Sequence, residues 1–459
     1  MDNNTICSIS TAPGHGAISI IRISGKESIK IVNELFKAHN KNKLSSKNIN
    51  KVILGNIIYK QQNIDEVLVT AFQSPKSYTG EDMVEISCHG SAYIQSKIIQ
   101  ALIDSGCRTA QKGEFTMRAF LNGKLDLSQA EGVANLIASE NEKSHKIAMK
   151  QMRGGFSNEI KNLRKKFIKF AALIELELDF SQEDVEFANR QELLILINNI
   201  ENKIAKLANS FKLGNVIKNG IPITIVGSPN SGKSTLLNQI LNEERAIVSN
   251  IKGTTRDTIE ENIVIKGYKF KFIDTAGLRN TKDKIEKIGI SKTYKKISES
   301  AFILYMIDKT EFNQIEIEKE ILNIQKKMQS NDSLIVLGNK HDLHKQDIVF
   351  KKIKNVNIIN ISAKKGDKID VILKTIMSKV QTWGDNNNQI IIINQRHFES
   401  LINTLKSIGD IKEGLKQNIS GELLSIDIKN CLEYLGQITG EITNNNLLDS
   451  IFQDFCIGK

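Results

Sequence analysis

The feature that most constrains the fold of this 459-residue chain is the segment GSPNSGKS at residues 227–234. It follows an apolar run typical of a buried strand and precedes TLLN, which begins a helical pattern. This is the strand–loop–helix setting of the GxxxxGK[ST] phosphate-binding loop. There, backbone N–H groups surround the phosphates and the helix N-terminus adds partial positive charge. We expect Lys233 to reach the β- and γ-phosphates and Ser234 to ligate magnesium.

Three further motifs indicate a guanine nucleotide. DTAG at residues 274–277 follows a second strand-like run, so its aspartate can hold magnesium through water and its glycine can sense the γ-phosphate. NKHD at 339–342 supplies a carboxylate that accepts two hydrogen bonds from guanine, which adenine cannot donate. SAK at 362–364 can support the base. We therefore predict GTP binding and hydrolysis. The predicted GTP contacts are Asn230, Ser231, Gly232, Lys233, Ser234, Thr235, Ser249, Thr254, Thr255, Asp274, Thr275, Ala276, Gly277, Asn339, Lys340, Asp342, Ser362, Ala363 and Lys364.

The segment GTTRD at 253–257 is typical of a loop that closes over the γ-phosphate. Either Thr254 or Thr255 can bind the magnesium ion, and we assign it to Thr255. The position after DTAG holds Leu278, where Ras-type GTPases carry a glutamine that orients the attacking water. The protein must either hydrolyse GTP slowly or supply the water-orienting group from elsewhere. The nearby charged candidates are Arg279, Asp283 and Glu286, although these residues taken alone favour a solvated surface charge at each position.

The part of the chain with the nucleotide motifs has an α/β pattern of apolar residues, and the segments on either side of it have different patterns. Apolar strand-like runs alternate with helical stretches from Gly220 to about Lys379, which predicts a doubly wound α/β domain. The strands are expected near 223–226, 270–273, 302–307, 334–337 and 356–361.

Before and after that domain, the pattern differs. The first 120 residues show period-two runs broken by glycine and one helix near 93–103, as in an α+β domain. Helical periodicity follows over 128–215, opened by a capping box of Ser128 and Glu131, and returns over 396–459. The α/β domain is thus predicted to be inserted into an all-α domain made of two segments. The expected domains span 1–120, 121–215, 216–380 and 381–459.

The net charge and the cysteines indicate which partners and which cellular compartment to expect. The net charge of +11 favours anionic partners, although a lysine-rich proteome explains it equally well. The five cysteines form no CxxC pair, which indicates a reducing compartment. The N-terminus lacks a signal-peptide pattern and no run approaches the length of a membrane span. We expect a cytoplasmic protein without a membrane partner.

With these motifs in view, the chain resembles the MnmE (TrmE) family of tRNA modification GTPases over essentially its whole length. Besides the nucleotide motifs, the resemblance rests on TAPGHGAISIIRISG, SYTGEDMVEISCHG, GEFTMRAFLNGKLDLSQAEG and the final FCIGK. It implies a multidomain protein with an N-terminal α+β tetrahydrofolate-binding domain, an all-α domain from two segments and an inserted P-loop G domain. It also implies a homodimer joined through the N-terminal domains.

The resemblance further implies a chemistry. With a flavin-dependent, MnmG-like partner in a heterotetramer, such proteins form an aminomethyl-type group at C5 of the wobble uridine in certain tRNAs. The one-carbon unit comes from 5-formyltetrahydrofolate or a related tetrahydrofolate. By position, Arg22, Glu85, Lys124 and the C-terminal Lys459 match folate contacts, and Cys456 matches a cysteine of possible chemical importance.

The same resemblance supplies candidates for catalysis. A potassium ion takes the place of an arginine finger and adds positive charge to the phosphate clamp. Glu286 matches the residue that orients the attacking water and acts with Lys233 and Thr255. The potassium ligands implied are Asn230, Ser249, Ile251 and Thr254.

One other function stays open, and a second is excluded as the whole function by the complete G domain. A ribosome-assembly or RNA-binding GTPase switch would share the G motifs and the absent glutamine, but would lack a folate-like N-terminal domain and the FCIGK tail. A folate-dependent aminomethyl transferase alone would lack the G domain. The lysines of 161–169 are a candidate tRNA face, with a solvated helix face as the alternative.

Overall fold

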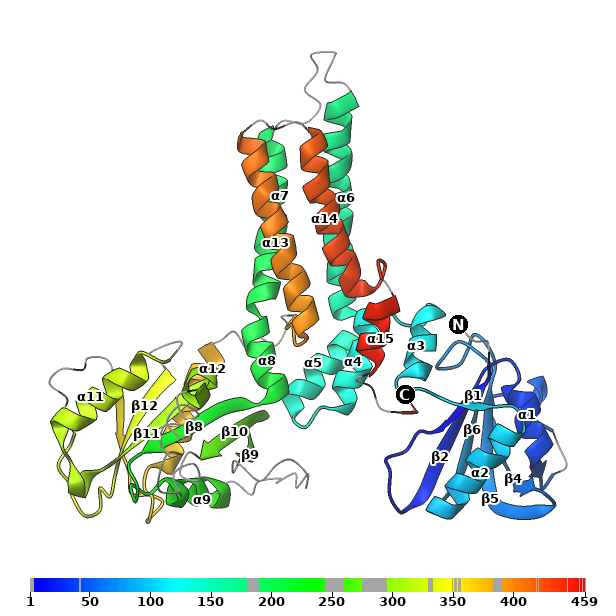
Figure 1. Ribbon diagram of the computed structural model, residues 1–459, viewed down its shortest axis with the longest axis horizontal. Coiled ribbons are helices and arrows are strands. Elements are labelled where there is room, and N and C mark those ends of the chain that lie inside the picture. The colour runs from blue at the N-terminus through cyan, green and yellow to red at the C-terminus, as the bar shows by residue number, and fades with distance from the viewer. Residues whose placement is uncertain are drawn as a thin grey trace, which may run out of the picture. The chain divides into compact units, whose positions relative to one another are not determined.

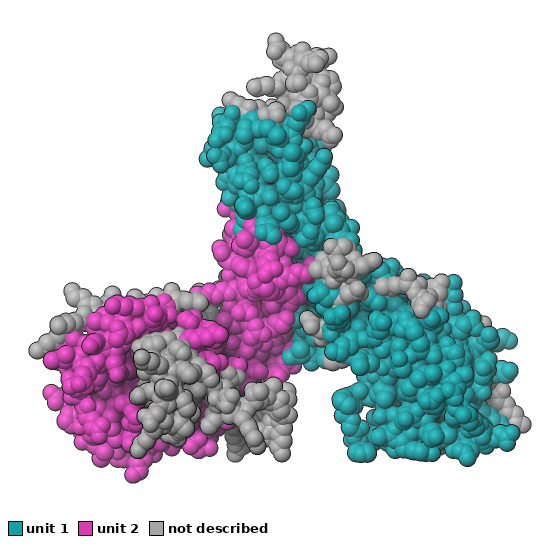
Figure 2. Space-filling view, viewed as in Figure 1, with its two compact units in different colours: residues 1–138, 148–201, 403–459 teal, residues 139–147, 202–402 magenta. Residues whose placement is uncertain are grey.

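The computed structural model divides into two compact units (Figure 2). One comprises residues 1–138, 148–201 and 403–459, and the other 139–147 and 202–402. The structure describes residues 4–40, 43–179, 190–243, 260–274, 295–328, 333–348, 350, 353, 356–382, 390–417, 419, 421–443, 445–453, 455 and 457–458.

The N-terminal part of the first unit is a seven-stranded sheet (Figure 1) in the order β3-β4-β5-β6-β2-β1-β7. Its neighbours are antiparallel except for the parallel pair β1–β7. The strands are β1 (Ile6–Ile9), β2 (Gly16–Ser24), β3 (Phe36–Ala38), β4 (Val52–Tyr59), β5 (Gln62–Phe72), β6 (Met83–Gly90) and β7 (Arg108–Thr109).

Helices α1 (Ser28–Leu35) and α2 (Ala92–Asp104) cover one face of that sheet, since their apolar residues share a core with alternate residues of β2, β5 and β6. The other face is less covered: Val52, Leu54 and Leu68 are 65%, 45% and 44% exposed. A short 3-10 turn, η1 (Ser46–Asn48), precedes β4. The α+β prediction is confirmed, and α2 contains the helix expected at 93–103.

The helical part of the first unit joins segments from both sides of the insertion. Helix α6 (Gly155–Asp179) packs against α14 (Gly421–Thr439). Lys412 of α13 (Gln395–Lys416) pairs with Glu201 of α7 (Arg190–Asn209) at 2.6 Å. The prediction of an all-α domain built from two chain segments is confirmed. The remaining helices here are α3 (Glu114–Leu121), α4 (Leu127–Ile137), α5 (Glu142–Met152) and α15 (Asn445–Gln453).

The predicted start of α4 was wrong. Its N-cap is Asp126, whose carboxylate accepts from the Gln129 backbone N–H at 3.0 Å while the Gln129 side chain accepts from the Asp126 N–H at 3.0 Å. Ser128 lies inside the helix and is fully buried. The sequence holds two capping-box patterns, Ser128 with Glu131 and Asp126 with Gln129, and the second, two residues earlier, begins the helix.

The second unit carries a six-stranded sheet in the order β13-β12-β11-β8-β10-β9, parallel except for the edge pair β10–β9. The strands are β8 (Ile221–Gly227), β9 (Glu260–Ile265), β10 (Tyr268–Asp274), β11 (Phe302–Asp308), β12 (Leu334–Asn339) and β13 (Asn357–Asn360). Five of them confirm the predicted runs, whereas the antiparallel edge strand β9 was missed.

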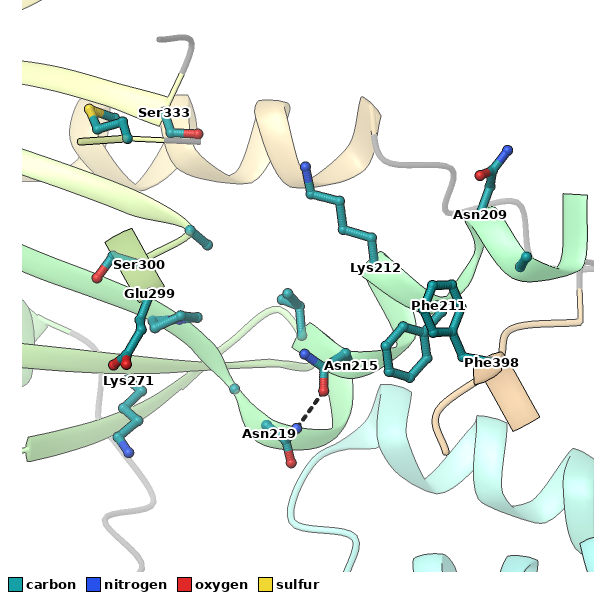
Figure 3. A pocket seen from close by; sticks show the side chains of 16 residues that line it. Asn209, Phe211, Lys212, Asn215, Asn219, Lys271, Glu299, Ser300, Ser333 and Phe398 are labelled. Carbon is teal, nitrogen blue, oxygen red and sulfur yellow. Dashed lines mark hydrogen bonds between the residues drawn. The ribbon is translucent and has the colours of Figure 1, made fainter. Parts of the chain in front are cut away.

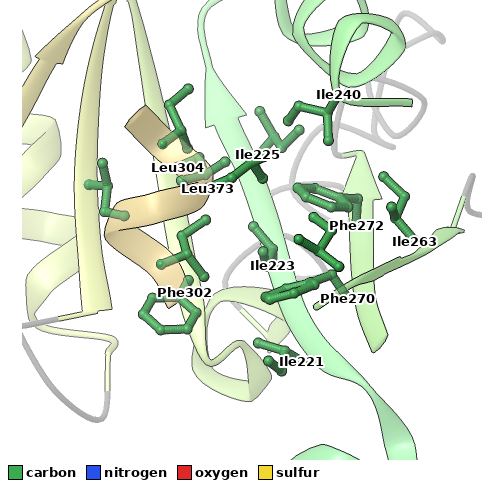
Figure 4. Close-up of a cluster of buried hydrophobic side chains, with 14 of the residues drawn as sticks. Ile221, Ile223, Ile225, Ile240, Ile263, Phe270, Phe272, Phe302, Leu304 and Leu373 are labelled. Atoms are coloured by element: carbon green, nitrogen blue, oxygen red, sulfur yellow. The ribbon is translucent and has the colours of Figure 1, made fainter. Parts of the chain in front are cut away.

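Both faces of this sheet are buried, as a doubly wound fold requires. One core packs α9 (Lys233–Glu243) and α12 (Ile369–Thr382) against β8, β10 and β11 (Figure 4). The other packs α11 (Gln314–Gln325) against the opposite face of β11 and β12. Helix α8 (Phe211–Asn219) leads into β8, and the 3-10 turn η3 (Lys309–Glu311) follows β11. Among the described residues, no helix combines the length and apolarity needed to cross a membrane.

Candidate active site

The phosphate-binding loop lies between the carboxyl end of β8 and the start of α9. Two residues of the loop have left-handed backbones, Asn230 at φ 62° and Gly232 at φ 99°. At Gly232 a Cβ atom would lie 2.3 Å from Nδ2 of Asn339, so a side chain there would strike the guanine-recognition strand. Asn230 is exposed at the tip of the loop. The loop therefore leaves its outer rim open while its inner side is tightly packed.

Lys233 is almost buried, at 7% exposure, and its ammonium donates to the carbonyl oxygens of Gly227 at 3.0 Å and Ser228 at 2.8 Å. Ser231 is fully buried and its hydroxyl also donates to the Ser228 carbonyl, at 2.8 Å. These bonds fix the loop from within. Phosphate oxygens offer the ammonium stronger, charge-assisted acceptors than the two carbonyls. The exposed Ser234 stands in the first turn of α9, where a magnesium ligand fits.

The guanine end is organised around Asn339, which is 4% exposed. Its Nδ2 donates to the Ser231 carbonyl at 2.7 Å and its Oδ1 accepts from the Ala363 N–H at 2.9 Å. One amide thus joins the phosphate loop, the NKHD strand end and the SAK loop. The structure brings together the described members of these three predicted motifs.

Asp342 is held in place by Ser362, whose buried hydroxyl donates to Oδ1 at 2.8 Å. That hydrogen bond is the main reason why the pKa of Asp342 lies below its usual value. The carboxyl group is therefore ionised at neutral pH, which is the form that accepts two hydrogen bonds from guanine.

Two residues at the end of β11 were missed by the sequence analysis. Buried Asp308 pairs with the ammonium of Lys340, which has a left-handed backbone at φ 61°. Lys309, 3% exposed, contacts Nδ1 of His341 at 2.8 Å. The sequence contained a signal for both residues, because they follow the buried run 302–307. Polar residues in that position lie at the same sheet edge as the other nucleotide motifs. Lys364, the last SAK residue, is exposed.

Asp274 is the last residue of β10, beside β8, as predicted for a magnesium-directed aspartate. Its side chain lies outside the described part of the structure, and so do several other predicted residues. These are Ser249, Ile251, Thr254, Thr255, Thr275, Ala276, Gly277 and Glu286.

The second unit also holds a pocket of about 660 Å³ (Figure 3). Its lining includes Pro222 at the start of β8, Ala301 just before β11, and the stacked rings of Phe211 and Phe398. Pro222 and Ala301 lie at the amino ends of their strands. The nucleotide motifs follow the carboxyl ends, so this pocket is separate from the nucleotide site.

In the first unit, the predicted folate residues Arg22 and Glu85 form a direct pair. They are opposite each other on β2 and β6, and Nη2 of Arg22 lies 2.8 Å from Oε1 of Glu85. The guanidinium lies over the rings of Tyr78 and Phe115, 5.2 and 5.7 Å from their centroids. Neither aromatic residue was predicted. The cation–π contacts and the ion pair hold the guanidinium at one place on the sheet.

Lys124 and the C-terminal tail reach the same region. The Lys124 ammonium donates to the Pro75 carbonyl at 2.9 Å, in the loop that carries Tyr78. In the tail, Ile457 forms a β-bridge with Lys112, and the Gly458 carbonyl accepts from the Ser10 hydroxyl at 3.0 Å. Ser10 follows β1, the strand that pairs with β2. Cys456 and Lys459 lie outside the described residues.

A parallel sheet with a phosphate loop after one strand and an NKHD strand end joined to it by hydrogen bonds defines a P-loop GTP-binding protein. Two family models match: one for the MnmE helical domain over residues 127–456 and one described as GTP-binding protein TrmE N-terminus over 5–124. The chain belongs to the MnmE family of tRNA modification GTPases. That membership identifies it as a GTP hydrolase, as the four motifs predicted.

Curated relatives match along the full chain. A tRNA modification GTPase MnmE from Flavobacterium johnsoniae is 51% identical over 100% of both chains. One from Bacteroides thetaiotaomicron is 48% identical, again over 100% of each. Among solved structures, Aquifex aeolicus Era bound to GDP·AlF4− is 28% identical, with a TM-score of 0.28, covering 40% of this chain and 66% of that one.

Proposed function

We propose that this protein couples potassium-dependent GTP hydrolysis to formation of an aminomethyl-type group at C5 of the wobble uridine in certain tRNAs. The one-carbon unit comes from a tetrahydrofolate, and a flavin-dependent, MnmG-like protein is the partner in the modification. The observation that carries the proposal is the Arg22–Glu85 pair, 2.8 Å apart beside the docked C-terminal tail. A ribosome-assembly GTPase switch would lack the folate-like N-terminal domain and the FCIGK tail that carry these residues.

Four residues act on the nucleotide in this proposal, two of them through magnesium. Asp342 reads the guanine edge, and Lys233 moves from the loop carbonyls to the β- and γ-phosphates. Ser234 and Thr255 hold magnesium, which neutralises charge on the β- and γ-phosphate oxygens when it is bound. The tightly packed loop limits how far the phosphates can shift. Positioning and charge supply most of the acceleration in reactions of this type.

The potassium dependence rests on two features. Leu278 cannot orient the attacking water, so this chain does not follow the Ras-type arrangement, and a potassium ion in place of an arginine finger is our proposal for the charge. Asn230 stands exposed at the loop rim with a left-handed backbone, where its side-chain oxygen can face a cation. Ser249, Ile251 and Thr254 complete the proposed ion site. Glu286 orients the attacking water.

The folate would be held by residues that the sheet fixes in place. Only Oε1 of Glu85 takes the Arg22 bonds, so Oε2 remains on the sheet face to accept N–H donors of a pterin ring. Arg22, Lys124 and Lys459 suit the glutamate carboxylates. The folate supplies the one-carbon unit when bound, and Cys456 is a candidate for a further chemical role.

The partners follow from surfaces of the first unit and from family membership. Val52, Leu54 and Leu68 form an apolar area on the uncovered sheet face, which supports a homodimer joined there. The names of the relatives support tRNA as the substrate. A heterotetramer with the MnmG-like partner and a cytoplasmic location complete the proposal.

The first experiment is GTP turnover by the purified protein in potassium and in sodium buffer, with ATP as the control. We expect strong stimulation by potassium, and its loss in Asn230→Ala and Glu286→Ala. Equal slow rates in both salts would argue against the potassium mechanism and favour a ribosome-assembly switch.

A binding measurement tests the folate half separately. Glu85→Gln should weaken binding of 5-formyltetrahydrofolate, because the amide cannot serve as a charged acceptor. Glu66→Gln, an exposed carboxylate on β5, is the matched control. Equal affinity in all three proteins would remove Glu85 from the site.

A further inference from the structure

One strongly basic stretch of the chain falls largely on the helix α6. Residues 148–174 hold seven Lys or Arg and one Glu, which is more than half of the net charge of +11. From Ile160 to Ile174 there are five basic residues and no carboxylate. Residues 35–64 also hold six lysines and no carboxylate, so net charge alone does not single out residues 148–174, and what distinguishes them is where the helix places them.

The helix α6 places Lys161, Lys165 and Lys169 on its outer side. Leu163, Phe167 and Phe170 are at most 1% exposed and face the core of the unit. The opposite side carries three exposed lysines and two exposed asparagines. We call this face the α6 stripe; it consists of Asn158, Lys161, Asn162, Lys165 and Lys169. The three lysines stand four residues apart and cover about 12 Å of helix.

Helix stability gives no reason for such an arrangement. Like charges four residues apart destabilise a helix, whereas alternating signs stabilise it. On the packed partner helix α14, Lys429 stands between Asp427 and Glu433. Within the described residues, Lys161 pairs with Asp126 at 3.3 Å, while Lys165 and Lys169 form no ion pair. Lys165 and Lys169 therefore present uncompensated cations to a partner, and Lys161 is shared with one carboxylate.

We propose that the α6 stripe binds the phosphate backbone of RNA. The inference rests on the proposed function and locates the surface for its substrate. Lysines supply most of the affinity for phosphates, and asparagine side chains add hydrogen bonds to phosphate and sugar. A row of cations without carboxylates matches a polyanion, whereas a protein partner of mixed charge would require both signs.

The stripe also leads towards the candidate folate site. Lys161 contacts Asp126, two residues after Lys124, and Lys124 bonds the loop that carries Tyr78 beneath Arg22. An RNA strand along α6 would thus continue towards the Arg22–Glu85 pair. The stripe holds the backbone while a base extends to the site of modification.

The experiment measures binding of an unmodified tRNA transcript by the full-length protein over a series of salt concentrations. The test variant is K161Q/K165Q/K169Q. The matched control is K406Q/K416Q/K429Q, which removes three exposed lysines from α13 and α14. We expect weaker binding only in the test variant. Its slope of log K against log salt should fall by roughly 2 to 3, one counterion equivalent for each lost contact.

Further readouts separate the possible failures. GTP turnover without RNA and the thermal midpoint should match wild type in both variants, and K161R/K165R/K169R should restore RNA binding. If the wild type itself does not bind tRNA, the proposed function fails. If the wild type binds and the test variant binds equally well, or no worse than the control, the α6 stripe is overturned. Binding of anionic lipid vesicles is measured in parallel. If the test variant lost vesicle binding but kept RNA binding, the proposal for the α6 stripe would also be overturned.

Discussion

The guanine end and the phosphate end of the nucleotide site are held in different ways. At the guanine end, Asn339 and Ser362 already hold the loop and the Asp342 carboxylate in an arrangement that can receive a base. At the phosphate end, the Lys233 ammonium is bonded to the carbonyls of its own loop. The first end needs little change on binding, whereas the second must exchange hydrogen bonds.

This difference implies that the guanine end serves base recognition and the phosphate end serves catalysis. A prepared guanine end discriminates between bases, because a wrong base leaves its buried polar groups unpaired. A lysine that transfers from carbonyls to phosphates places its charge where negative charge is clamped. Substitutions at the two ends should therefore affect different kinetic constants.

The largest effect is expected at the phosphate end. In Lys233→Met the stem of the side chain remains but the charge is lost, so GTP turnover should fall by about 10²–10³-fold. Lys374→Met, an exposed lysine on α12, is the control and should keep wild-type turnover. Single-turnover hydrolysis measures the chemical step. A rise in KM with an unchanged single-turnover rate would show that Lys233 only binds the nucleotide.

The next effect belongs to the guanine end. Asp342→Asn replaces an acceptor-only carboxylate by an amide that can also donate. We expect GTP to bind about a hundredfold more weakly, from two lost charge-assisted hydrogen bonds. Xanthosine triphosphate should gain affinity, because its 2-oxo group accepts where guanine donates. Asp347→Asn is the control. Unchanged base preference in Asp342→Asn would show that the guanine end is not read by this carboxylate.

Much of this site could be predicted from the sequence, because the motifs are local and strand order places them at one edge. The GxxxxGK[ST] and NKHD segments required only a strand before each. The Asn339 bridge could not be predicted, since it joins residues more than a hundred positions apart. The Asp308–Lys340 pair and the rings below Arg22 depend on side-chain packing across strands. The start of α4 was missed because two capping patterns competed within two residues.

A third substitution tests whether one amide organises the guanine end. Asn339→Ala removes the donor to Ser231 and the acceptor for Ala363, both inside the fold. We expect a loss of about 1–2 kcal/mol in stability of the nucleotide-free domain. Thermal unfolding followed with and without GDP measures it. Asn360→Ala, whose Nδ2 bonds exposed Asp347, is the control with a smaller expected change. Identical thermal midpoints for the two variants would mean that the Asn339 hydrogen bonds stabilise the protein no more than the exposed bond of Asn360.

The smallest effect concerns Asp308, which pairs with Lys340 of the NKHD motif at the guanine end. Burial alone would raise its pKa, but hydrogen bonds from Lys340 and Thr310 outweigh burial and lower the pKa below the ordinary value. A lowered folded pKa stabilises the protein above the unfolded value of about 3.9, and this stability is lost as pH falls through the folded pKa.

In Lys340→Met, burial of Asp308 is no longer offset, so its folded pKa should rise. Acid unfolding of the nucleotide-free protein should then begin at a higher pH than in wild type, with at most about 1 kcal/mol lost at neutral pH. Circular dichroism during acid titration measures the shift. Lys374→Met leaves Asp308 untouched and should follow the wild-type curve. If Lys340→Met followed it as well, the pair would contribute nothing to the stability of the prepared end, which would then depend on Asn339 and Ser362 alone.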